Sequence, residues 1–187
     1  MKARRSAQNR ESLAGHLLLA NPALKDDNFK RTVILLSSHG EEGAMGVVLN
    51  RPLDKQLGEL NVSFALGGLA GVPVYCGGPV EPDQLIIVSW QWLEKESAFQ
   101  MHFGIDPEKA TELVGTPGLV LRAFVGYSGW SRGQLEEELQ RDTWFVTPVE
   151  GEQLGRADGI ALWRRILGGM DPELKLLADE PDDPELN

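Results

Sequence analysis

The sequence predicts one α+β domain, a largely antiparallel mixed sheet with helices packed on it. Three observations support this fold class. With 187 residues the chain is long enough for one well-buried core and short for two. Hydrophobic residues make up 42% and charged residues 25%, which is the composition of a globular protein. About seven strand patterns and four helix patterns fail to alternate along the chain, which argues against a doubly wound parallel sheet.

The clearest strand signals lie in the first third of the chain. Residues 17–20 form a short apolar run that Asn21-Pro22 ends, and residues 32–38 are apolar on both faces, as in a strand inside a sheet. A Gly-containing turn leads from there to a strand over 44–49, which predicts a hairpin. Further strands are predicted over 72–75, 85–88, 120–125 and 144–147.

Four helices are predicted from capping residues and apolar spacing. One begins at Asp106-Pro107, with Asp as the N-cap and Pro at the first helical position. The next begins with Ser131 and Gln134, which fit a capping box in which the Ser131 hydroxyl accepts from a helix amide and Gln134 reaches back. It runs to about residue 141, and the glutamates at 136–138 form its solvated face.

The last two helices are predicted near the end of the chain. One runs over 158–167 and is stopped by Gly168-Gly169, because a glycine pair is a common helix end. Asp171-Pro172 opens the other in the same way as Asp106-Pro107.

Both ends of the chain lack apolar residues that a core would bury. We therefore expect disordered tails over 1–12 and 179–187, with a single domain over 13–178. Basic residues precede an apolar stretch near the start, but Gly15 and His16 interrupt that stretch, so a signal peptide is not expected. No run approaches the roughly 18 apolar residues of a membrane span. The expected compartment is the cytoplasm, without membrane attachment.

Charge and cysteine content narrow the functional classes. The net charge of −10 and the pI near 4.8 oppose binding to phosphate backbones, so direct nucleic-acid binding is disfavoured. Cys76 is the single cysteine, so no internal disulfide and no cysteine metal cluster can form within one chain. The basic side chains that favour a nucleic-acid role are Arg4, Arg5, Arg10, Lys30 and Arg31.

Known catalytic and cofactor motifs are missing from the sequence. It has no Walker loop and no Gly-x-Gly-x-x-Gly fingerprint. Residues 126–130 resemble a nucleophile elbow, but Trp130 stands where that pattern requires glycine. His16, His39 and His102 lack metal-ligand spacing and are expected to be ordinary strand or loop residues. We predict no metal site and no cofactor.

An enzymatic alternative stays open at two places. Cys76 ends a strand directly before Gly77-Gly78-Pro79, where a sharp turn would expose and activate the thiol. The opposing interpretation is that Cys76 is a small buried hydrophobe. Glu136 and Glu138 would be the acid and base of an enzyme whose site is assembled from distant loops.

Five segments of the chain resemble, in this order, the YqgE/AlgH family of bacterial proteins. They are LAGHLLLANPALKDDNF at 13–29, RTVILLSSHGEEGAMGVVLNRPL at 31–53, PVYCGGPV at 73–80, VGYSGWSRGQLEEEL at 125–139 and LWRRILGG at 162–169. The resemblance, over about residues 13–172, implies a sheet that curls into a barrel-like core flanked by helices. It brings no reaction, and the AlgH name implies a regulatory role in transcription without establishing direct DNA binding.

The function predicted from these observations is a non-enzymatic binding or regulatory module for a protein or small ligand. Its motif segments 43–52, 77–79 and 126–138 are expected to meet at one end of the sheet. Arg132 and the free amides of the capped helix would hold an anion. Tyr127 and Trp130, just before this helix, would form an aromatic wall beside the anion, unless both rings pack in the core beneath the turn. The predicted surface residues are Asn50, Arg51, Gly77, Gly78, Pro79, Tyr127, Trp130, Arg132 and Gln134.

Overall fold

The computed structural model describes residues 11–151, 153–154 and 159–180. The predicted tails therefore lie outside the described residues, except for 11, 12, 179 and 180. The strands are β1 (His16–Ala20), β2 (Val33–Gly40), β3 (Gly43–Val48), β4 (Pro52–Gln56), β5 (Pro73–Cys76), β6 (Val80–Leu93), β7 (Ala98–Phe103), β8 (Leu119–Ser131) and β9 (Trp144–Pro148). The helices are α1 (Leu57–Leu60), α2 (Pro107–Leu113), α3 (Gln134–Gln140), α4 (Gly159–Met170) and α5 (Pro172–Asp179), with a 3-10 helix, η1, at Val62–Phe64.

All nine strands belong to one mixed sheet in the order β4-β5-β8-β3-β2-β1-β9, while β6 pairs with β8 and β7 pairs with β6. Every pairing is antiparallel except that of β5 with β8. The predicted α+β class and its largely antiparallel mixed sheet are therefore confirmed. The sheet is open, because β4 and β9 end the path without pairing to each other over the part of the chain described.

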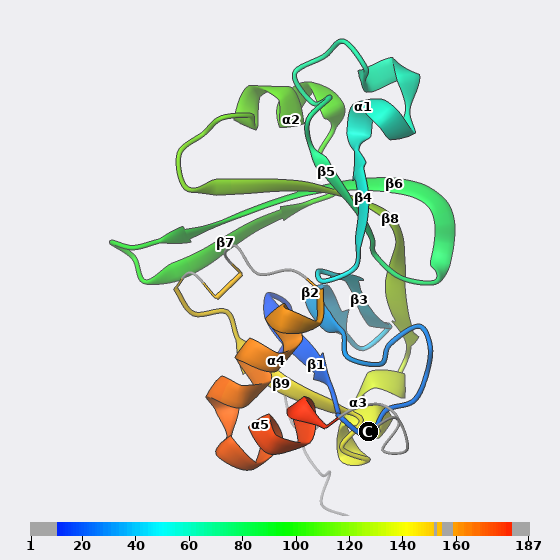
Figure 1. Ribbon diagram of the computed structural model, residues 1–187, viewed down its shortest axis with the longest axis vertical. Helices are drawn as coiled ribbons and strands as arrows, with labels where there is room; N and C mark the ends of the chain where they lie inside the picture. The colour runs from blue at the N-terminus through cyan, green and yellow to red at the C-terminus, as the bar shows by residue number, and fades with distance from the viewer. Residues whose placement is uncertain (1–10, 152, 155–158, 181–187) are drawn as a thin grey trace, which may run out of the picture.

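Strand β8 joins the two halves of the molecule (Figure 1). Its first half pairs with β5 and β6, and its second half pairs with β3, where Gly46 lies opposite Ser128. Helices α1 and α2 lie at the end of the molecule formed by β5 and β6, and α4 and α5 lie beside β1 and β9 (Figure 1). The long strand thus holds two helix-covered regions in one sheet.

The sheet curls strongly between β8 and β9. Trp130 near the end of β8 and Trp144 at the start of β9 lie four strands apart in the sheet order. A flat sheet would separate such strands by about 19 Å, since neighbouring strands are about 4.8 Å apart. The two ring centroids are only 6.0 Å apart, and Phe29 packs against both rings. This curl is the barrel-like feature that the family resemblance implies.

The core explains why residues 33–36 are apolar without interruption. Alternate residues of a strand face opposite sides of the sheet, and both sides are covered here. Ile34 and Leu36 enter the cluster inside the curl, together with Trp130 and Trp144. Val33 and Leu35 enter the cluster under α4 and α5. A third cluster lies between α1, α2 and the strands β5, β6 and β8.

Two strands and one helix were not predicted. Strand β4 is exposed along its whole length and begins with proline, so it lacks the apolar alternation by which a strand is recognised. Strand β7 pairs with β6 alone, at the edge of the sheet. Strand β6 runs over Val80–Leu93, far beyond the predicted 85–88, because its second half forms a hairpin with β7. The four-residue α1 is too short to show a helical pattern.

The predicted capping box at α3 is half correct. The N-cap is Gly133, in a left-handed conformation with φ 76°, and Ser131 still belongs to β8. Gln134 does reach back, because its Oε1 accepts from the Ser131 amide at 3.0 Å. The Ser131 hydroxyl donates to that same oxygen at 3.2 Å instead of accepting from the helix. The Gln134 side chain therefore links the start of α3 to the end of β8, and the left-handed Gly133 is the N-cap at which the helix begins.

The predicted end of α4 at Gly168-Gly169 is wrong, since the helix continues to Met170. A Cβ on Gly168 would lie 3.1 Å from Lys175 of α5, so glycine here permits close packing of the two helices. The predicted first residue, Asp158, lies outside the described residues. Asp171 caps α5 as predicted, because its carboxylate accepts from the Glu173 amide at 2.7 Å.

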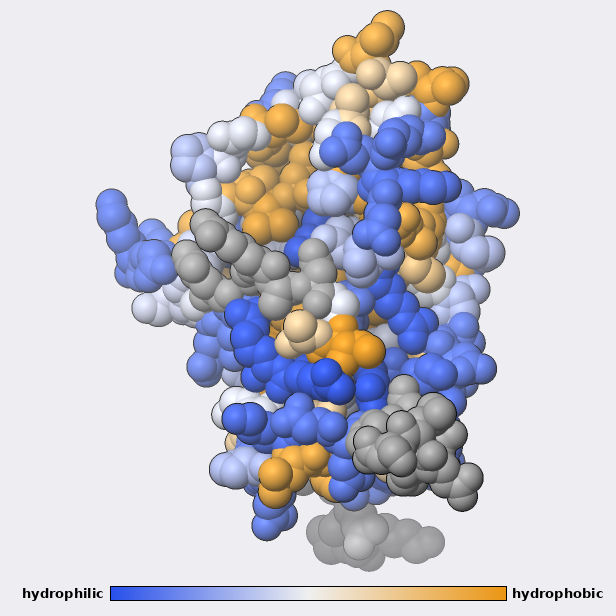
Figure 2. All heavy atoms as spheres, viewed as in Figure 1, coloured by the Kyte–Doolittle hydropathy of each residue, from blue (hydrophilic) through white to orange (hydrophobic). Residues whose placement is uncertain are grey.

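The surface is divided by polarity (Figure 2). In this view apolar residues gather over α1 and the segment after it, and hydrophilic residues cover much of the half that contains α4 and α5. Val62 and Leu66 are among the most exposed apolar side chains. None of the helices among the described residues has both the length and the apolar character needed to cross a bilayer.

Candidate functional site

A crossing of glycines fixes the geometry of the candidate site. Residues 77–78 pass directly against β8, where Cβ atoms would collide with backbone. A Cβ on Gly77 would lie 2.2 Å from the carbonyl oxygen of Gly126, and one on Gly78 would lie 2.3 Å from that of Tyr127. The Gly77 carbonyl accepts hydrogen bonds from the Val48 amide and the Ser128 hydroxyl at 2.9 and 3.1 Å. The three motif segments predicted from sequence therefore meet at this crossing.

A bulge at the start of β6 follows the crossing. Val80 pairs with Tyr127 and Leu85 pairs with Val125, so β6 advances five residues while β8 advances two. Glu81 takes up part of this excess with a left-handed backbone, φ 45°. Bulges of this kind re-aim side chains near binding sites. Here the bulge keeps residues 81–84 out of the regular pairing with β8.

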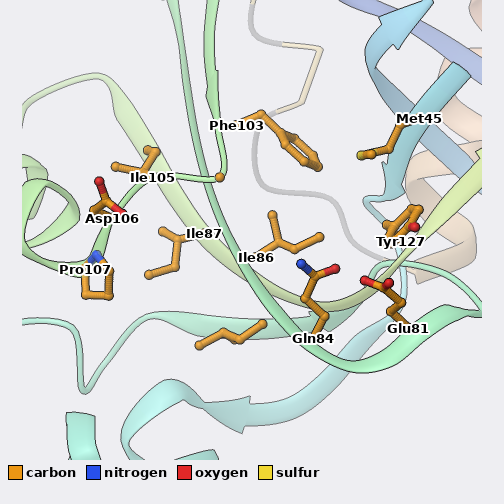
Figure 3. Close-up of a pocket in the computed structure, with 12 residues that line it drawn as sticks. Met45, Glu81, Gln84, Ile86, Ile87, Phe103, Ile105, Asp106, Pro107 and Tyr127 are labelled. Carbon is orange, nitrogen blue, oxygen red and sulfur yellow. The ribbon is translucent and has the colours of Figure 1, made fainter.

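A hollow of about 480 Å³ lies beside this bulge, between β3, β6, β8 and the segment that leads from β7 into α2 (Figure 3). Its volume lies within the range of roughly 300–1,000 Å³ that is typical of small-molecule sites. The apolar side chains that line it are Met45, Leu85, Ile86, Ile87, Phe103, Ile105 and Pro107. The polar side chains are Glu81, Gln84, Asp106 and Tyr127.

The four polar side chains of the hollow have no hydrogen bond or ion pair within the part of the chain that the structure describes. Asp106 is the clearest case. It occupies the N-cap position of α2, where an aspartate normally accepts from the helix amides, yet its carboxylate makes no capping bond. Figure 3 shows Glu81, Gln84 and Tyr127 near one another, with Asp106 farther along beside Ile105. The hollow thus combines an apolar wall with unused acceptors.

Residues 17–175 match the family model described as AlgH-like. This chain belongs to the AlgH-like family. A UPF0301 protein of Streptomyces coelicolor is 39% identical over 94% of this chain and 96% of its own length. A UPF0301 protein of Chlorobium limicola is 33% identical over 92% of this chain and 95% of its own length.

Two solved structures share the AlgH-like fold. The solution structure of the AlgH protein of Pseudomonas aeruginosa matches with a TM-score of 0.66 and 26% identity, over 98% of this chain and all of its own. A crystal structure of a Corynebacterium diphtheriae protein matches with a TM-score of 0.69 and 24% identity, over 93% and 95% of the two chains. The YqgE/AlgH resemblance seen in the sequence is therefore confirmed.

In this AlgH-like chain, Asn50 is buried and its amide is fully used. Its Oδ1 accepts from the Val33 amide at 2.8 Å, and its Nδ2 donates to the carbonyls of Arg31 and Gly159 at 2.9 and 3.0 Å. It therefore ties β2, the end of β3 and α4 together. Asn50 does not line the hollow.

Arg51 binds the loop that leads into β2, away from the hollow. It donates to the carbonyls of Asp27 and Lys30 at 3.0 and 3.4 Å. A hydrogen bond from Lys30, then the charges of Lys30 and Arg51, lower the pKa of the Asp27 carboxyl below its ordinary value of 3.8. Of the basic residues that favoured a nucleic-acid role, Lys30 is thus paired and Arg31 donates to the Glu180 carbonyl. Arg4, Arg5 and Arg10 lie outside the described residues.

The prediction that 136–138 is a solvated face is wrong for two of its glutamates. Glu138 Oε2 accepts from the indole nitrogens of Trp130 and Trp144 at 2.8 and 2.7 Å, and its Oε1 accepts from Gln134 at 3.0 Å. Glu136 Oε1 lies 3.1 Å from Nε2 of His39. The two indole rings belong to β8 and β9, so the spacing of residues along α3 alone could not predict these contacts. Trp130 is buried, as its core interpretation requires, whereas Tyr127 is half-buried and lines the hollow.

The remaining predicted residues lie outside the hollow. Arg132 donates to the Glu41 carbonyl at 3.0 Å and lies 3.4 Å from the Glu42 carboxylate, so it ties the link between β8 and α3 to the turn between β2 and β3. Pro79 is exposed beside the crossing, and Cys76 is a half-buried free thiol at the end of β5. The structure therefore brings Gly77, Gly78 and Tyr127 together at the crossing, but of the predicted surface residues only Tyr127 lines the hollow. Asn50, Arg51, Arg132 and Gln134 lie elsewhere.

The histidines of this AlgH-like chain are separate from one another. His39 Nδ1 accepts from the Leu13 amide at 3.0 Å, so in this arrangement Nε2 carries the proton that points to Glu136. His16 lies in β1 and His102 in β7. No group of three or more His, Cys, Asp or Glu side chains among the described residues is placed to hold a metal ion.

Of the residues that line the hollow, sequence reasoning named only Tyr127 as part of a binding surface, and it did not name the others, among them Glu81, Gln84, Phe103 and Asp106. Asp106 was interpreted as a helix cap, which describes its backbone but not its side chain. One sequence signal does point to the bulge. Pro82 interrupts a segment that otherwise continues into a strand, and proline within a strand marks an edge or a bulge.

Proposed function

We propose that this chain is a non-enzymatic binding module whose ligand site is the hollow between β3, β6 and β8. The observation that carries the proposal is the group of four polar side chains that face an apolar hollow without partners among the described residues. Glu81, Gln84 and Asp106 are exposed and Tyr127 is half-buried, so their polar atoms can reach a ligand in the hollow. These groups are available to orient a ligand, and the apolar wall supplies its binding energy.

The lining favours binding over catalysis. It contains no Ser, Thr, Cys, Lys or His side chain, so a nucleophile paired with a base does not face the hollow. The carboxylates considered for an enzyme, Glu136 and Glu138, are held by His39 and by two indoles. No observation specifically favours the enzymatic alternative.

A regulatory role would follow from ligand binding. The net charge of −10 opposes contact with a phosphate backbone, so we propose that any effect on transcription is indirect and passes through a ligand or a protein partner. The single cysteine suits a reducing compartment, and we place this activity in the cytoplasm.

The energetics set the expected affinity. Each 100 Å² of apolar ligand surface removed from water contributes about 2.5 kcal/mol, against the cost of immobilising the ligand. A ligand that fills the hollow is therefore expected to bind in the micromolar range, equivalent to about −8 kcal/mol.

A neutral apolar fluorophore, N-phenyl-1-naphthylamine, tests the proposal. Its emission should rise saturably on addition of the protein. Gln84→Trp, which fills the hollow from an exposed position on β6, should weaken binding at least about tenfold. The matched control is Gln100→Trp, the same change at an exposed position on β7 that does not line the hollow. Equal binding by the wild type and Gln84→Trp would overturn the proposal.

A further inference from the structure

We infer that the ligand of the hollow is an apolar molecule that carries a cationic amine. This inference rests on the proposed function and names its ligand class. It follows from the charge of the lining, from the placement of its acceptors and from the backbone of Glu81.

The ionisable carboxyl groups of the hollow are uncompensated. Glu81 and Asp106 are both acidic, and no Lys, Arg or His is part of the lining. Lys109, one turn along α2 from Asp106, forms no ion pair with it within the described chain. The net charge of −10 adds a long-range attraction for cations. A cation is therefore favoured over a neutral molecule, and an anion is disfavoured.

The acceptors suit an ammonium group. An ammonium has three donors and no acceptor, so it needs several acceptors around one point. The Glu81 carboxylate, the Gln84 amide oxygen and the Tyr127 hydroxyl lie near one another at one end of the hollow (Figure 3). Met45, Ile86 and Phe103 provide the adjoining apolar wall (Figure 3). An amine at this end would leave the apolar body of the ligand against that wall.

The backbone of Glu81 supports the same assignment. Its φ of 45° is a left-handed conformation that a glutamate adopts only at a cost in free energy. Glycine or asparagine would occupy such a position more easily. Strained residues gather at ligand sites because the surrounding structure holds a functional side chain in place. The Glu81 side chain lines the hollow from this position in the bulge (Figure 3).

Three probes of one shape test the inference: 4-phenylbutylamine, 4-phenylbutanol and 4-phenylbutyrate. Each is titrated into the ¹⁵N-labelled full chain at pH 7 and low salt, and the amide shifts of Ile86, Ile87 and Gly104 report on the hollow. The amine is expected to bind about 2- to 5-fold more tightly than the alcohol, and the acid is expected to bind most weakly. Added salt should reduce the advantage of the amine, because both carboxylates are exposed.

Charge-neutral variants identify the groups responsible. Glu81→Gln combined with Asp106→Asn should bring the amine to the affinity of the alcohol, while binding of the alcohol stays unchanged. Asp83→Asn is the matched control, because it removes an exposed carboxylate of β6 that does not line the hollow. It should keep most of the preference for the amine. If the double variant does not fold, Glu81→Gln alone gives the same comparison at an exposed site.

The outcomes separate the two proposals. If the alcohol and the amine shift the hollow amides with equal affinity, or if the acid binds best, the ligand class is wrong and the binding module stands. If none of the three probes shifts these amides, the hollow does not bind such ligands, and the proposed function fails together with the inference.

Discussion

Tyr127 and Trp130 lie three residues apart on β8, and they serve opposite purposes. Alternation along a strand places them on opposite faces of the sheet. Trp130 closes the curl, where its indole nitrogen donates to Glu138 and its ring packs against Phe29 and Trp144. Tyr127 borders the hollow, where its hydroxyl has no partner in the described part of the protein. One motif thus contains a residue that completes the core and a residue that is free to bind.

The difference shows how to separate structural from functional residues in a motif. Around Trp130 each polar atom is used: Glu138 receives both indoles, and Gln134 joins it to the end of β8. Around Tyr127 the polar atoms of Glu81, Gln84 and Asp106 are unused. Changes on the first side should affect stability, and changes on the second side should affect binding.

Gly78→Ala should have the largest effect, because the crossing supports both sides. Its φ is 149°, and the new Cβ would lie 2.3 Å from the backbone of Tyr127. We expect the free energy of unfolding to fall by at least about 3 kcal/mol. Chemical denaturation measures this loss. Gly71→Ala is the control, since its Cβ would meet nothing within 4 Å, and a similar loss in both variants would contradict the role of the crossing.

Glu138→Leu should break the Trp130 side alone. It removes the acceptor of two indole N–H groups on buried tryptophans. Each lost partner costs about 1–3 kcal/mol, so the free energy of unfolding should fall by about 2–4 kcal/mol. Glu137→Leu, on the exposed face of the same helix, should change stability by less than about 0.5 kcal/mol. Equal losses for the two variants would show that Glu138 has no special role.

Sequence patterns predict the part of this fold that depends on local order. The unbroken apolar run at 33–36 indicates a strand covered on both faces, and Asp171-Pro172 indicates the cap of α5. The hollow depends on a different property, the register between β6 and β8. That register places Tyr127 beside Glu81, which lies 46 residues earlier. Short-range spacing contains no information about such a pairing.

The misinterpreted glutamates teach the same lesson. Glu138 looks solvated when only α3 is considered, because its partners are rings of β8 and β9. They reach it because the sheet curls, and the curl is a property of five strands together. Strand β4 was missed for the opposite reason. It is exposed along its whole length and has no apolar pattern, so only its pairing with β5 identifies it as a strand.

Glu81→Gly should sharpen the comparison, because it is expected to raise stability while weakening binding. Glycine relieves the left-handed backbone at a smaller entropic cost, so unfolding should require about 0.5 kcal/mol more. Titration with 4-phenylbutylamine should show weaker binding by the same variant. Asp54→Gly is the matched control, with φ 52° on β4 and no place in the hollow, and it should raise stability without affecting binding. A fall in stability of Glu81→Gly would contradict the strain.

Asp27→Asn should have the smallest effect, on the loop whose Phe29 covers Trp130. The pKa of Asp27 is lowered in the folded chain by Lys30 and then by Arg51, so its ionised form stabilises the fold. This contribution is present above its ordinary pKa of 3.8 and is lost as the pH falls through the lowered value. The midpoint of denaturant unfolding should therefore be lower for the variant than for the wild type at pH 6, and the two midpoints should agree at strongly acidic pH. A difference that persists there would refute the ionic origin.

The central place of β8 has a consequence for how the chain is made. Its partners β3 and β5 are both synthesised earlier. Gly43 of β3 pairs with Ser131 of β8, which is synthesised 88 residues later. At roughly 5–20 residues per second, β3 remains without its second neighbour for about 4–18 s on the ribosome. During that interval an edge that is buried in the finished sheet is open to other chains. Joining of the two halves is therefore a late event, which begins only when β8 leaves the exit tunnel.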